Sequence, residues 1–177
     1  MAVEFAILEN VETPGMGSMR AWFDEPFEGL VARAVRLGDA VPAGVRMGYH
    51  LCYGDVAEKH FKEPADTTNL TRVANALFGG VSRHVDFVHM PVPIERDDEA
   101  YFAPLEEFRL PAGTELYLSL LHREDGLEGA LPRMKAAKPA RSAFGVATEC
   151  GMGRGPRDEM EPLLSLHGEA VRAARKL

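Results

Sequence analysis

The sequence has few cysteines, no long hydrophobic run and no surplus of positive charge. Its two cysteines, Cys52 and Cys150, are too few for the disulfide framework of a small secreted domain. No stretch approaches the roughly 20 consecutive apolar residues of a membrane-spanning helix. Residues 1–12 carry acids where a secretory signal has basic residues and an apolar core. These absences predict a cytoplasmic location and no membrane partner.

The balance of charge argues against a nucleic-acid partner. The chain has 20 Lys and Arg against 27 Asp and Glu, which gives a formal net charge of −7. Binding to phosphates needs a surplus of Lys and Arg on one face of the protein. The sequence contains no such basic cluster, so we expect no binding to nucleic acid.

The length fits one domain, which we take to span residues 1–177. With 177 residues, 46% of them hydrophobic, the chain can bury roughly 70% of its unfolded surface. A complete eight-stranded α/β barrel usually takes about 250 residues, so the chain is short for that fold.

Short apolar runs alternate along the chain with segments of helical spacing. The expected strands are 2–8, 45–51, 85–90, 114–121 and 144–148. The expected helices are 25–37, 68–82, 98–108, 127–137 and 161–175. Strand and helix recur at spacings of about 30 to 40 residues, which is typical of parallel βα units. The pattern predicts an α/β fold with about five βα units.

The expected strands are nearly continuous apolar runs, which is typical of a sheet whose two faces are both buried. An open doubly wound sheet and a barrel both fit this pattern. In either architecture, ligands bind beyond the carboxyl ends of the strands. We therefore expect the functional residues at those ends.

Titratable side chains collect at the carboxyl ends of the expected strands. In chain order they are Glu9, His50 with Cys52, His89, His122 and Cys150. His50 and Cys52 lie two residues apart on an extended segment, so their side chains point to the same face. An imidazole and a thiolate on one face are half of a tetrahedral zinc site.

Cys150 completes the metal site only if the sheet curls. Its strand lies three strands from that of His50, roughly 14 Å away at the usual strand spacing of about 4.7 Å. Side chains on a flat sheet stay parallel, whereas those inside a barrel converge on a common axis. The alternative is that the histidine and both cysteines simply pack in the core, where free cysteine is common.

Two segments resemble the catalytic domain of cobalamin-independent methionine synthase. They are 49–53 (YHLCY) and 149–154 (ECGMGR), each at the end of an expected strand. More broadly, the chain is similar to the superfamily of uroporphyrinogen decarboxylase and the zinc methyltransferases. The resemblance implies a partial (βα)8 barrel, in which the five units of this chain match barrel strands four to eight.

The resemblance also implies zinc as cofactor and a small-molecule thiol and a methyl donor as substrates. His50, Cys52 and Cys150 match three zinc-ligand positions, and His122 matches a histidine that protonates the departing methyl carrier. The family places a ligating glutamate where this sequence has Pro91. His89, two residues earlier on the same face, is our expected fourth ligand, and Glu95 is a second candidate.

Three further residues are candidates for substrate binding. In the family a carboxylate near the end of the first matched strand contacts the substrate amine, which points to Glu4 or Glu9. The alternative is that these two acids are partly solvated at a terminal strand. Arg154 lies in a glycine-rich turn where many barrels bind phosphate, although a plain loop is the alternative. His60 is expected in or beside a helix and is interpreted as a surface residue.

Matched to the family, the chain lacks barrel strands one to three. We therefore expect a homo-oligomer or a complementing polypeptide to cover the open interior and the unpaired strand edges. The first functional hypothesis is zinc-dependent methyl transfer to a thiol. The second is a non-catalytic barrel fragment that acts as a binding or interaction module.

Overall fold

The computed structural model describes residues 8, 21, 23–54, 60 and 63–177, which form an α/β fold. The strands are β1 (Gly48–His50), β2 (Phe87–Met90), β3 (Glu115–Leu121) and β4 (Gly145–Thr148). The α-helices are α2 (Pro26–Asp39), α3 (Thr68–Gly80), α4 (Glu99–Phe102), α5 (Gly126–Ala137) and α6 (Met160–Ala174). Three short 3-10 helices are η1 (Ala103–Glu107), η2 (Met152–Arg154) and η3 (Arg157–Glu159). Within the described ranges, no helix combines the length and apolar character needed to cross a bilayer.

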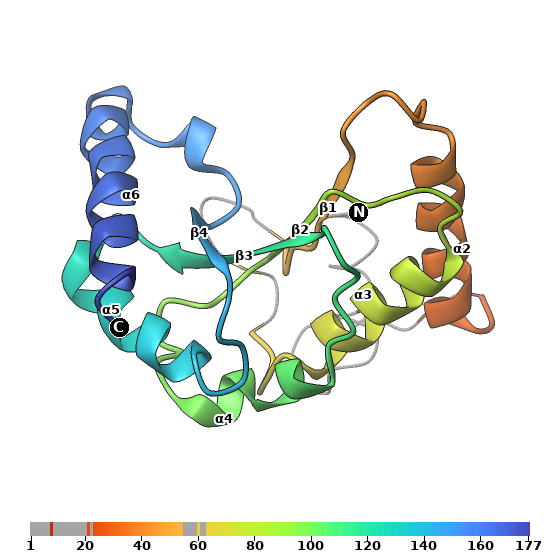
Figure 1. Ribbon diagram of the computed structural model, residues 1–177, viewed down its shortest axis with the longest axis horizontal. Helices are drawn as coiled ribbons and strands as arrows, with labels where there is room; N and C mark the ends of the chain where they lie inside the picture. The colour runs from red at the N-terminus through yellow and green to blue at the C-terminus, as the bar shows by residue number, and fades with distance from the viewer. Residues whose placement is uncertain (1–7, 9–20, 22, 55–59, 61–62) are drawn as a thin grey trace.

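The four strands form one parallel sheet in the order β1-β2-β3-β4, so each crossover leads to the adjacent strand. Right-handed crossovers that all step in the same direction place their helices on one face of the sheet. Figure 1 shows this arrangement, with α2, α3, α4, α5 and α6 along an outer arc around the strands. The predicted parallel βα pattern is confirmed for these four strands. The expected strand 2–8 lies outside the described residues.

One helix differs from its prediction. Residues 98–108 were expected to form a single helix, but the segment divides into the four-residue α4 and the 3-10 helix η1. Asp98 caps the start of α4 by accepting a hydrogen bond from the Tyr101 backbone N–H. Pro104 has no backbone N–H, so it cannot donate to the carbonyl of Ala100 and continue the α-helical ladder.

The two faces of the sheet differ in burial. Tyr49, Val88, Leu116 and Leu118 are almost fully buried on the face covered by the helices. On the opposite face, alternate residues of β1 and β2 are only half-buried. The expectation that both faces are buried is therefore not met by these alternate residues of β1 and β2, which include His50 and His89.

Arg133, on α5, holds together the loops that follow β2 and β3. Its guanidinium is almost fully buried and donates to the carbonyl of Ile94, 2.7 Å away, and to that of Leu120, 3.1 Å away. It also forms two hydrogen bonds to the carboxylate of Asp125, at 2.6 and 2.8 Å. One side chain thus fixes both loops at the carboxyl end of the sheet.

Replacing Arg133 with methionine should lower the free energy of unfolding by about 3 kcal/mol, because Asp125 and two carbonyls lose a buried cationic partner. Denaturant unfolding measures this change. Lys135→Met, an exposed position on the same helix, is the matched control and should change stability by less than about 0.5 kcal/mol. Equal effects of the two substitutions would contradict the role of Arg133.

Candidate functional site

The structure brings His50, Cys52 and Cys150 together at the carboxyl end of the sheet. One potential ligand atom from each of the three lies within 4.8 Å of the others. His50 belongs to β1 and Cys150 follows β4, the two outermost strands of the described sheet. On a flat sheet these strands would be roughly 14 Å apart at the usual spacing. The carboxyl ends of the strands therefore converge, as the metal-site hypothesis required.

The donor atoms of this group suit a metal that prefers sulfur and nitrogen. Cys52 is buried and Cys150 is half-buried, and neither forms a disulfide. Nδ1 of His50 lies 2.8 Å from Nδ1 of His89, whereas its Nε2 is buried without a hydrogen-bond partner. Burial lowers the pKa of His50, which favours the neutral ring that binds metals. An imidazole nitrogen without a hydrogen-bond partner and two thiols are the kinds of donor that zinc prefers.

His89 lies beside His50, and the structure does not place it in the group with the two cysteines. Its Nδ1 contacts His50, and its Nε2 lies 2.7 Å from Oγ of Ser119. Burial, with a smaller effect from the charge of His50, lowers the pKa of His89 to about 4. Both ring nitrogens are thus occupied, and the expected ligand Glu95 is exposed in the loop after β2.

His122 follows β3 and is almost fully buried. Its Nε2 lies 3.0 Å from the carbonyl oxygen of Val92, so this nitrogen carries the proton and donates it. Its Nδ1 lies 3.6 Å from Oε2 of Glu149. Together with Glu124, these two residues form a second group whose possible ligand atoms lie within 4.8 Å of one another.

Glu149 connects the two groups because it immediately precedes Cys150. Burial raises the pKa of its carboxyl group, but the hydrogen bond and charge of His122 and the charges of His60 and Arg123 lower it. The net pKa is below the usual value, so Glu149 is ionised at neutral pH. A carboxylate therefore faces the Nδ1 side of the buried His122 ring.

His60 was missed as a site residue. Its side chain is only 7% exposed, which contradicts its interpretation as a surface residue. The ring packs edge-on against Tyr53, with 5.5 Å between ring centroids, and its charge acts on Glu149. The expected position of His60 in or beside a helix suggested exposure, and no motif in the sequence indicated a contact with Tyr53.

Of the predicted substrate-binding residues, only Arg154 lies in the described part of the chain. Glu4 and Glu9 lie outside the described residues. Arg154 is exposed in η2, and its backbone N–H donates to the carbonyl of Gly151, 2.8 Å away. The glycine-rich turn is therefore built around this short 3-10 helix, for which Gly151 adopts a positive φ of 91°.

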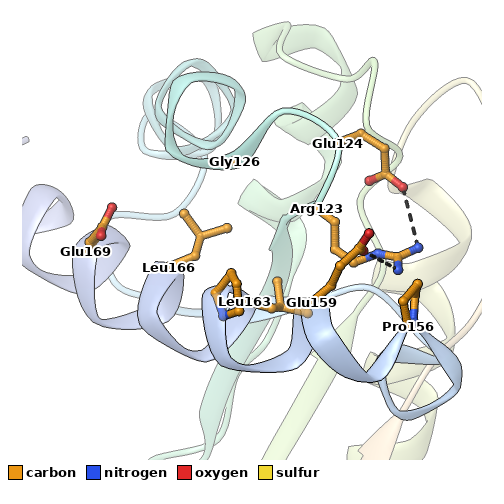
Figure 2. A pocket seen from close by; sticks show the side chains of 9 residues that line it. Arg123, Glu124, Gly126, Pro156, Glu159, Leu163, Leu166 and Glu169 are labelled. Carbon is orange, nitrogen blue, oxygen red and sulfur yellow. Dashed lines mark hydrogen bonds and ion pairs between the residues drawn. The ribbon is translucent and has the colours of Figure 1, made fainter.

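A cavity of about 510 Å³ lies between α6 and the loop after β3. Figure 2 shows Leu163 and Leu166 on α6 facing this space, with Arg123 at its edge. Arg123 forms a 2.8 Å ion pair with Glu159. Arg123 and Leu163 also line a second, small pocket that includes Cys150. The position of Arg123 directly after His122 was the sequence signal that could have identified it.

Comparisons with known proteins assign no family to this chain. A scan against protein-family models, a search of curated proteins and a search of solved structures each gave no match. The resemblance to cobalamin-independent methionine synthase therefore stays a prediction that rests on the two cysteine-containing motifs.

Proposed function

We propose that this protein binds zinc through His50, Cys52 and Cys150 and promotes methyl transfer to a thiol. The observation that carries the proposal is the convergence of one imidazole and two thiols within 4.8 Å. Thiolate and imidazole ligands favour zinc among the common divalent ions of proteins. Three protein ligands leave one tetrahedral position for a substrate, which is the arrangement of catalytic rather than structural zinc sites.

The residues around the group support a reaction at sulfur. When bound, zinc lowers the pKa of a coordinated thiol, and the thiolate form is the nucleophile. His122 is the proposed proton donor, and the proton at its Nε2 is committed to the carbonyl of Val92. A donated proton would therefore leave from Nδ1, on the side of Glu149. The cavity next to Arg123 offers space for a small molecule, and Arg123 also lines the small pocket that includes Cys150.

We also propose that the sheet is part of a (βα)8 barrel completed by a second copy or by another polypeptide. Consecutive strand order, helices on one face and converging strand ends support this proposal. Among the described residues, β4 pairs only with β3. Phe87 and Tyr117 lie half-buried on the face opposite the helices, where barrel strands would bury them. A cytoplasmic location also stays a prediction.

A binding module without turnover is the second candidate function. It is favoured by the burial of His122, which is 2% exposed and has both ring nitrogens next to protein atoms. In that arrangement the proton donor is not presented to a substrate. This candidate predicts no methyl transfer, and a protein that is purified without metal would favour it.

Purified protein should contain about one zinc per chain by elemental analysis. Cys52→Ser and Cys150→Ser should each weaken zinc binding by more than about 100-fold, which exceeds the roughly 10- to 100-fold loss typical of outer-shell substitutions. His167→Asn, on α6, is the matched control and should keep full affinity. Zinc that stays bound in both cysteine variants would overturn the proposed ligand set.

Homocysteine should add a third sulfur neighbour to the zinc, as counted by X-ray absorption at about 2.3 Å. Homoserine has the same shape without the thiol and should leave two sulfurs. His122→Gln removes the proposed proton donor and no metal ligand, so it should still show three sulfurs with homocysteine. A count that stays at two in excess homocysteine would contradict thiol activation.

The proposed completion of the barrel predicts a homodimer or a larger assembly when the chain is purified alone, unless a second polypeptide copurifies with it. Light scattering at micromolar concentration measures the molar mass, which should be at least twice the 19.4 kDa of one chain. The physical reason is that association would bury the half-buried Phe87 and Tyr117 and would cover the edge of β4. A single chain of monomeric mass would contradict this part of the proposal.

A further inference from the structure

A row of hydrogen-bonding side chains crosses three neighbouring strands of the sheet behind the candidate metal group. His50 on β1 and His89 on β2 are direct register partners, and Ser119 lies on β3. The two Nδ1 atoms are 2.8 Å apart, and Nε2 of His89 lies 2.7 Å from Oγ of Ser119. The imidazole rings are also packed together, with centroids 4.7 Å apart and an interplanar angle of 37°.

We propose that His89 and Ser119 are positioning residues that hold the His50 ring with a proton on Nδ1 and with Nε2 bare for the metal. The proposal rests on the proposed zinc site and names the residues that prepare it. It assigns His89 a supporting position in place of the fourth-ligand position expected from the sequence.

The direction of the hydrogen bonds follows from counting protons in this row. Two neutral imidazoles hold one proton between their facing Nδ1 atoms. If His50 donates that proton, its Nε2 is bare, and Nε2–H of His89 donates to Oγ of Ser119. Every ring N–H of the pair then has an acceptor.

The opposite direction leaves a buried donor without a partner. If His89 donated from Nδ1, a neutral His50 would carry its proton on Nε2. That nitrogen is buried and has no hydrogen-bond partner, and a buried N–H without an acceptor is unfavourable. A protonated Nε2 also cannot bind a metal until the proton moves. Both considerations favour His50 as the donor to His89.

Ser119 sets the orientation of the second ring. It is fully buried on β3, so its Oγ is a fixed acceptor for His89. Ligating histidines usually donate their second ring N–H to a protein acceptor, which sets both tautomer and orientation. Here the acceptor is a second histidine, itself fixed by a serine. With both nitrogens of His89 engaged, the fourth position at the metal stays available to a substrate.

The tautomers can be measured in the metal-free protein by two-bond ¹H–¹⁵N correlation NMR at neutral pH. We expect His50 as the Nδ1–H tautomer and His89 as the Nε2–H tautomer, with assignments from His50→Gln and His89→Asn. The reverse pair of tautomers would overturn the proposal. This measurement needs no metal, so it tests the row of hydrogen bonds independently of zinc binding. Absence of zinc from the wild-type protein would contradict only the proposed function.

Two substitutions of similar size test the acceptor at position 89. Asn keeps an oxygen near the place of Nδ1, whereas Leu offers none. His89→Leu should weaken zinc binding by about 10- to 100-fold and leave His50 as a mixture of tautomers, whereas His89→Asn should restore affinity to within a few fold. Circular dichroism confirms that both variants are folded. Equal zinc affinity in the folded Leu and Asn variants would overturn the positioning role.

Discussion

The convergence of the strand ends is the constraint on which the site depends. β1 and β4 are the outermost of four parallel strands, yet side chains from the ends of both meet within 4.8 Å. Parallel strands joined by right-handed crossovers that step in one direction carry their helices on one face. Side chains on the other face of a curved sheet then point toward a common centre. The chemistry of His50, Cys52 and Cys150 is thus a consequence of sheet curvature more than of any single loop.

Buried polar contacts keep the strand-end loops in place around this centre. Arg133 ties the loops after β2 and β3 together through two carbonyls and Asp125. His122 adds a hydrogen bond to Val92 in the first of these loops and lies next to Glu149, which precedes Cys150. These contacts give the buried Arg133 and His122 side chains defined acceptors, which is the condition for burying polar groups at low cost. The loops therefore present the thiols and imidazoles in one arrangement.

The sequence predicted the elements well and the contacts between their ends only in part. Apolar runs and turn residues in the sequence predicted β1 to β4, because both signals depend only on neighbouring residues in the chain. They could not show that His89 would engage both of its nitrogens with His50 and Ser119, because that depends on register between strands. His60 was also assigned to the surface because it was expected in or beside a helix, whereas its ring packs against Tyr53. Curvature itself was left open, as both a flat and a closed sheet fit the same pattern.

The most direct test of the account is the anomalous scattering of zinc in crystals of the zinc-loaded protein. The account predicts one zinc peak bonded to Nε2 of His50 and to the sulfurs of Cys52 and Cys150, with zinc–sulfur distances of about 2.3 Å. His89 should then lie behind His50 without contacting the ion. A zinc peak elsewhere, or a structure in which the two cysteine sulfurs do not share one ion, would contradict the claim that the curved sheet builds a metal centre.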